Sequence, residues 1–136
     1  MSSEQDLPLV TPYTEFGGET AIQNLVHRFY TLMDTLPEAW ELRQMHPTDL
    51  TGSEQKLFMY LSGWLGGPPL FEQAFGHPRL RARHMPFAID SQARDQWLMC
   101  MDLALKECIP AGPLRDKIQE AIVGLADHMR NRPDPA

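Results

Sequence analysis

Hydrophobic residues recur at helical spacing over most of the chain. In four stretches they fall three and four positions apart, which places them on one face of a helix. The spacing predicts helices over 19–35, from 51 to about 65, from 91 to about 108 and from 114 to about 129. No stretch alternates as a half-buried strand does, so the predicted fold class is all-α. The apolar positions behind this prediction are Ile22, Leu25, Val26, Phe29, Tyr30 and Met33; Leu57, Phe58, Tyr60, Leu61, Trp64 and Leu65; Trp97, Met101, Ala104, Leu105 and Cys108; and Leu114, Ile118, Ile122, Leu125 and Met129.

Prolines and polar residues mark the ends of these helices and of shorter ones between them. Pro37 allows a short helix over 37–44, which ends at His46-Pro47 because the residue before a proline disfavours the α conformation. Thr51 and Glu54 form the T-x-x-E pattern of a capping box. Asp90 or Ser91 is expected to cap the helix that follows. The segment 70–75 is ambiguous.

Two ends of the chain are expected to lie outside the helical domain. Residues 1–18 contain Pro8, Pro12 and Gly17-Gly18 and are predicted to form a flexible arm without a helix. Residues 131–136, NRPDPA, are predicted to be a frayed tail. One domain over 19–130 remains.

Composition narrows the function classes. The chain has 136 residues, of which 43% are hydrophobic, so it can bury one core. A net charge of −6 argues against a general nucleic-acid binder. The arginines nevertheless cluster between 79 and 94, which suggests a small anionic ligand.

The sequence also shows no sign of a membrane or of an oxidising compartment. It has no run of about 18 apolar residues, and its N-terminus lacks the basic and apolar regions of a signal peptide. Cys100 and Cys108 lie eight residues apart, roughly 12 Å along a helix, which is too far for a disulfide. We expect two reduced, buried thiols in a cytoplasmic protein.

The stretch RLRARHMPF at 79–87 carries the candidate chemistry. A short helix after Pro78 must end before Pro86, and His84 shares one face of it with Leu80. His84 is either a core histidine at a solvated helix end or a ligand. Zinc needs three or four protein ligands, and no such set lies nearby. Haem needs one ligand, an apolar slot and cations for two propionates. Candidates for the slot, each of which could equally be plain core, are Tyr60, Leu61, Trp64, Phe87, Trp97 and Met101, and the cations would be Lys56 and Arg83.

At this point a series of motifs resembles a known family. The motifs are FY at 29–30, HPTDL at 46–50, LSGWLGGPPLF at 61–71, GHPRLRARHMPF at 76–87 and RDQWLMCM at 94–101. Together they resemble the truncated haemoglobins of group II, over about residues 17–130. The resemblance implies a two-over-two helical sandwich around haem b, with loop replacing most of the helix before the iron ligand.

The resemblance assigns roles to individual residues. His84 would be the proximal iron ligand, its other ring nitrogen held by a carbonyl near residue 80. Tyr30, His46 and Trp97 would donate hydrogen bonds to a ligand on the distal side. Without the resemblance, His46 would be interpreted as a turn residue before a proline. Distal Ser53 and Leu57 would form a polar gate and an apolar wall. The residues implied to hold the cofactor are Lys56, Tyr60, Leu61, Phe71, Arg83, Phe87 and Met101.

The implied function is reversible binding of dioxygen, carbon monoxide or nitric oxide at ferrous haem. Two or three donors would slow dioxygen release by orders of magnitude, which suits redox chemistry or sensing better than oxygen transport. The alternatives are a haem enzyme with peroxidase-like or NO-detoxifying activity, and a haem-free helical interaction domain. A cellular reductase is the expected protein partner. His46, or in a competing version Tyr30, is a candidate internal iron ligand when no diatomic molecule is bound.

Overall fold

The computed structural model describes residues 11–134, and these are helical and free of strands. The helices in chain order are α1 (Pro12–Phe16), α2 (Gly18–Thr35), the 3-10 helix η2 (Pro37–Ala39), α3 (Trp40–Gln44), α4 (Thr51–Trp64), α5 (Leu70–Phe75), α6 (Leu80–His84), α7 (Ser91–Cys108) and α8 (Pro113–His128). The four long helices and the all-α class are confirmed. Within residues 11–134, no helix is both long and apolar enough to cross a bilayer.

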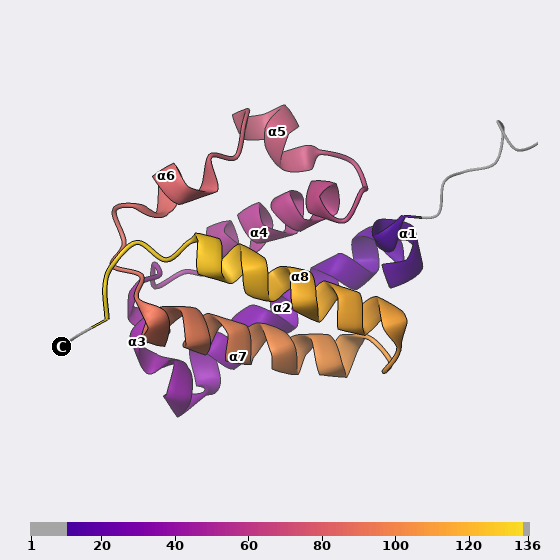
Figure 1. Ribbon diagram of the computed structural model, residues 1–136. Helices are drawn as coiled ribbons and strands as arrows, with labels where there is room; N and C mark the ends of the chain where they lie inside the picture. The colour runs from indigo at the N-terminus through magenta and orange to yellow at the C-terminus, as the bar shows by residue number, and fades with distance from the viewer. Residues whose placement is uncertain (1–10, 135–136) are drawn as a thin grey trace, which may run out of the picture.

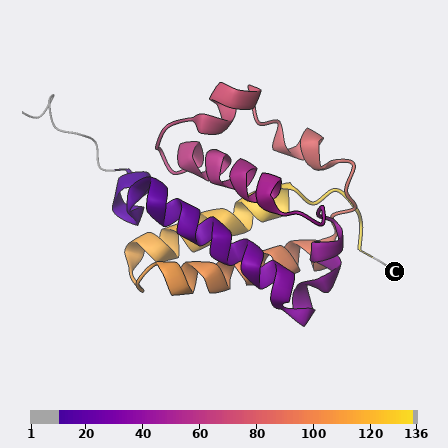
Figure 2. The same cartoon turned by 180° about the vertical axis from the view of Figure 1, so that it is seen from behind.

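The long helices form two stacked pairs. Helix α2 packs on α4, and α7 packs on α8, with α2 also crossing α7 (Figure 1). Seen from behind, α2 and α4 lie in front of α7 and α8 (Figure 2). The core lies where α2 meets α7, and Ile22, Phe29, Cys100, Met101 and Ala104 are fully buried there.

A helix in the N-terminal arm corrects the prediction for residues 11–18. Helix α1 starts at Pro12, and the Thr11 hydroxyl accepts a hydrogen bond from the Thr14 N–H at 3.3 Å. Proline is well suited to the first position of a helix, so Pro12 begins α1 rather than interrupting it. Gly17, at φ 118°, ends α1 and leads directly into α2. Residues 1–10 of the predicted arm lie outside the described residues.

The motif at 61–71 forms the corner that seats α1. The Tyr13 N–H donates to the Leu65 carbonyl at 2.8 Å. A Cβ at Gly67 would lie 2.3 Å from the Tyr13 ring, so only glycine lets the ring approach the corner. The buried Ser62 hydroxyl donates to the Pro68 carbonyl at 2.7 Å. The motif at 61–71 therefore has a structural role: it packs the end of α4 against α1.

The predicted N-cap of α4 is wrong, whereas the predicted N-cap of α7 is confirmed. The capping box at Thr51 is wrong: Leu50 is the N-cap, and the Thr51 N–H donates to the Asp49 carboxylate at 2.9 Å. The side chain two residues before the helix takes the orphan N–H, as in an Asx turn. The cap at Asp90 is confirmed, because its carboxylate accepts from the Ala93 N–H at 3.0 Å.

Two further expectations need correction. Cys100 is buried, but Cys108 is exposed, since Ile109 takes the buried position at the end of α7. The tail is not frayed over 131–134: Asn131 hydrogen-bonds to Ile89 between α6 and α7, and Asp134 hydrogen-bonds to Ser91, the first residue of α7. Residues 135–136 lie outside the described part.

Candidate functional site

His84 is the last residue of α6, and a backbone hydrogen bond within the helix holds its ring. Its Nδ1 lies 2.6 Å from the Leu80 carbonyl oxygen, the contact expected from the sequence. A carbonyl oxygen only accepts, so Nδ1 carries the proton of the neutral ring and Nε2 keeps its lone pair. Metal-binding histidines are held in this way.

The surroundings of His84 fit a large apolar group. None of the five residues of α6 is buried, and Met85 and Phe87 after it are exposed. In both views α6 lies alongside the N-terminal part of α4 (Figures 1 and 2). Of the fourteen residues of α4 only Leu61 and Ser62 are buried. A planar apolar molecule between α6 and α4 would cover surface that the protein alone leaves half-exposed.

Two cations gather beside α5. The Arg83 guanidinium lies 5.2 Å from the Phe71 ring centre, and the Lys56 ammonium lies 5.8 Å from the Phe75 ring centre. Arg83 also donates to the Pro78 carbonyl at 2.6 Å. Within residues 11–134 neither cation forms an ion pair with a carboxylate, so both can pair with a ligand's acidic groups.

Tyr30 and His46, two of the predicted distal residues, lie in contact with each other. Their ring centres are 5.8 Å apart, edge to face. Burial raises the pKa of the Tyr30 hydroxyl, so it stays a neutral phenol and a donor. The His46 Nδ1 lies 2.9 Å from the Leu42 carbonyl oxygen, so Nε2 of the neutral ring is an acceptor. Burial also lowers the pKa of His46, which opposes the protonated form. The expected donor role of His46 therefore needs a protonated ring.

Trp97 lies near Tyr30, with the Phe29 ring in contact with both. It is half-buried on α7, and its ring centre lies 5.2 Å from that of Phe29, which lies 4.9 Å from that of Tyr30. The structure thus brings together Tyr30 with His46, and Trp97 with Phe29.

The remaining predicted residues occupy three kinds of place. Ser53 and Leu57 are half-buried on α4. Phe71 is buried, 6.4 Å from the half-buried Tyr60 ring, whereas Phe87 is 43% exposed. Leu61 and Met101 are buried in the hydrophobic core.

Sequence reasoning missed Gln96, which ties α7 to α3. Its amide oxygen accepts from the Leu42 N–H at 3.0 Å, and its amide nitrogen donates to the Glu41 carboxylate at 2.9 Å. The Leu42 carbonyl in turn holds His46. The available signal was a glutamine four residues before Cys100, at a position that the helical period buries.

Comparisons with known proteins agree with this arrangement. A family model described as bacterial-like globin matches residues 11–131. A group 2 truncated haemoglobin of Bacillus subtilis is 38% identical over 121 residues, 89% of each chain. A group II two-on-two haemoglobin of Agrobacterium tumefaciens is 47% identical, with a TM-score of 0.89 over 97% of this chain and 99% of that one.

The chain belongs to the bacterial-like globins, in truncated haemoglobin group II.

Membership of this group confirms the two-over-two fold and implies a haem cofactor. A further solved structure, a truncated oxygen-avid haemoglobin from Bacillus subtilis, is 37% identical, with a TM-score of 0.83 over 90% of this chain and all of that one. The residues of this truncated haemoglobin fit such a group, since one histidine offers a free Nε2 between half-exposed apolar side chains and unpaired cations.

Proposed function

We propose that this protein binds haem b non-covalently through His84 and binds dioxygen, carbon monoxide or nitric oxide reversibly. The observation that carries the proposal is the bond from His84 Nδ1 to the Leu80 carbonyl, which keeps Nε2 unprotonated. Ferrous haem would supply one open iron position for a diatomic ligand. The surrounding side chains would bind and orient the haem and would set how long a diatomic ligand stays bound.

The proximal residues bind and orient. His84 would bind the iron through Nε2, while Arg83 and Lys56, which lie beside α5, would neutralise two propionates. Tyr60 and Phe71 would wall the slot and keep water out. An imidazole whose Nδ1 proton is already engaged binds a metal without losing a proton at neutral pH.

The distal residues would set how long a diatomic ligand stays. The Tyr30 hydroxyl and the Trp97 indole N–H are donors, and neutral His46 offers an acceptor 5.8 Å, centre to centre, from the Tyr30 ring. Each hydrogen bond to a partly charged acceptor is worth about 1.5–3 kcal/mol, so two would slow dioxygen release about a hundredfold or more. The relative titled oxygen-avid supports retention.

Long retention favours ligand chemistry or sensing over unloading. The aromatic series Tyr30, Phe29 and Trp97, with ring centres 4.9 and 5.2 Å apart, supports a second candidate. That candidate is a haem enzyme with peroxidase-like or NO-detoxifying activity, because tyrosine and tryptophan can each give up an electron. Either role calls for a cellular reductase as partner.

The test is the dioxygen dissociation rate of the reduced, haem-loaded protein, measured by stopped flow. Trp97→Phe and Tyr30→Phe each remove one donor and keep a ring, so each should speed release by about tenfold or more. Tyr13→Phe removes a hydroxyl from α1, which takes no part in the proposed site, and should leave the rate unchanged. Equal rates in all four proteins would contradict the proposed distal role.

A further inference from the structure

The C-terminal tail that follows α8, residues 129–134, lies against α6 and the segment that joins it to α7. The Asn131 N–H donates to the Ile89 carbonyl at 2.9 Å, and the Ile89 N–H donates to the Asn131 side-chain oxygen at 3.0 Å. The Arg132 N–H reaches the same carbonyl at 3.1 Å. The tail and the linker are therefore joined in both directions.

Asn131 also holds the backbone of His84. Its side-chain nitrogen donates to the His84 carbonyl oxygen at 3.0 Å. One amide thus bonds to two points of the proximal segment, as an acceptor at Ile89 and as a donor at His84. An ionised aspartate has no donor, so only an amide satisfies both contacts at this place.

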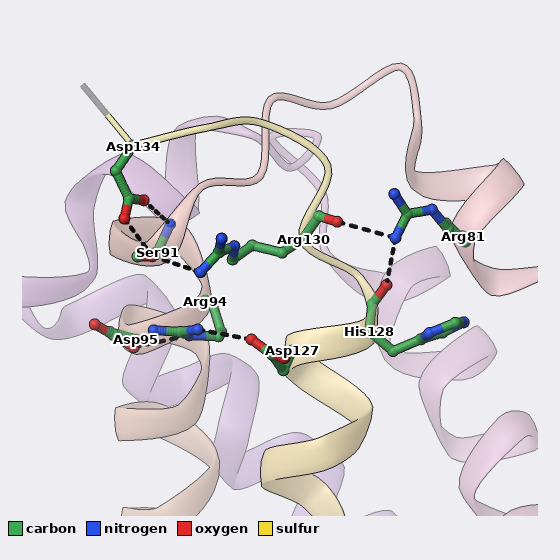
Figure 3. Close-up of polar contacts among 8 residues, drawn as sticks. All are labelled: Arg81, Ser91, Arg94, Asp95, Asp127, His128, Arg130 and Asp134. Atoms are coloured by element: carbon green, nitrogen blue, oxygen red, sulfur yellow. Dashed lines mark hydrogen bonds and ion pairs between the residues drawn. The ribbon is translucent and has the colours of Figure 1, made fainter. Parts of the chain in front are cut away.

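Helix α6 depends on such outside contacts. It has five residues, none of them buried, and a helix of one to two turns is not stable by itself. Arg81 gives it a second tie, because its guanidinium donates to the carbonyls of His128 and Arg130 at 3.3 and 3.2 Å (Figure 3). A cation at the C-terminal end of α8 is also favoured by the helix dipole.

We propose that the C-terminal tail positions the proximal histidine, with Asn131 and Arg81 as the positioning residues. This inference rests on the proposed binding of haem through His84. The imidazole is fixed by Leu80 through Nδ1, and the backbone that carries it is fixed by Asn131. Without the tail, Nε2 would sample a wider range of positions and hold iron less well.

The experiment compares haem-loaded wild-type protein with Asn131→Asp and, as an independent variant should Asn131→Asp fail to fold, Arg81→Gln. The first readout is the iron–histidine stretching frequency of the reduced, ligand-free protein by resonance Raman, which should shift and broaden. The second is hemin loss to an excess of a haem-scavenging apoprotein. It should be about three- to tenfold faster, as expected for one or two lost hydrogen bonds.

Asp134→Ala is the matched control. Asp134 bonds the same tail to Ser91, at 3.0 Å to the N–H and 2.9 Å to the hydroxyl, and does not touch α6. Its Raman band should match the wild type. An unshifted band and unchanged hemin loss in the Asn131 and Arg81 variants would overturn the inference while leaving the proposed function intact. So would an equal shift in Asp134→Ala, since that would reflect general loosening. A wild-type protein that binds no hemin would overturn the proposed function as well.

Discussion

The two sides of the candidate haem site are held by different forces. On the distal side Phe29 is 0% exposed and Tyr30 is 6% exposed, within the core that α2 and α7 share. On the proximal side none of the residues of α6 is buried, and α6 is held by a hydrogen bond that the Asn131 side chain donates to the His84 carbonyl and by those that Arg81 donates to the His128 and Arg130 carbonyls. The distal residues depend on non-directional packing, whereas the proximal histidine depends on a few directional contacts.

This difference separates stability from function. Packing of the distal side contributes to the free energy of unfolding of the whole domain, so damage there unfolds the protein. The proximal side adds little to folding, so damage there should leave a folded protein with weakened haem binding. Each of the following changes acts on one side and leaves the other in place.

The largest effect is expected from His84→Gly. The variant should fold, because His84 lies on an unburied helix, but it should lose the cofactor almost completely through loss of its one protein ligand. The measurement is Soret absorbance per protein after reconstitution with hemin. His27→Gly, at an exposed position of α2, should keep the wild-type value. Retained Soret absorbance in His84→Gly would show that another residue binds the iron.

Phe29→Ala should break the distal side through the fold. A buried phenylalanine replaced by alanine lowers the free energy of unfolding by about 3–5 kcal/mol. Denaturant unfolding followed by circular dichroism measures the loss. Leu103→Ala, at an exposed position of α7, should change it by less than about 0.5–1 kcal/mol. Equal losses in the two variants would contradict a packed distal side.

Gln96→Leu tests the polar tie on the distal side. It leaves the Leu42 N–H and the Glu41 carboxylate without their partner, which should cost about 1–3 kcal/mol. The matched change is Gln119→Leu, which removes a half-buried amide bonded to Asp102 at 2.6 Å, far from α3. Gln96→Leu alone should also alter dioxygen dissociation, through the Leu42 carbonyl that holds His46. Unaltered dissociation would show that Gln96 acts only on stability.

The smallest effect concerns pH. Burial lowers the pKa of His46 in the folded protein, so below about pH 6.5, the usual histidine value, the unfolded chain takes up the proton more readily. Stability should therefore fall as the pH drops from 7.5 to 5. His46→Phe should flatten this dependence. Urea unfolding at a series of pH values compares the two proteins, and parallel curves would mean that His46 does not titrate as described.

The sequence predicted features that depend on local period and missed those that depend on distant partners. Helices α2 and α7 follow from their apolar stripes. Helix α1 was missed because it is held by Tyr13 against Gly67, more than fifty residues away. The cap of α4 was misplaced because the Asp49 carboxylate accepts the Thr51 N–H, which the Glu54 side chain would accept in a capping box. The sequence alone does not show which carboxylate takes it.

The site shows the same division. The family motifs led to His84 and to its bond with the carbonyl four residues earlier, which is local to α6. The hydrogen bonds of the Gln96 and Asn131 amides could not be predicted, because their partners lie on other elements. The tautomer of His46 likewise follows from the Leu42 carbonyl in the folded corner, and it changes an expected donor into an acceptor.

The most direct test of the central claim, that His84 holds a haem with an exchangeable position, is an absorption spectrum of the purified protein. It should be taken in the ferric state, after reduction with dithionite and after addition of carbon monoxide. The account predicts a Soret band that shifts on reduction and shifts again with carbon monoxide. A protein that stays colourless after hemin is added, or a reduced band that carbon monoxide does not move, would contradict it.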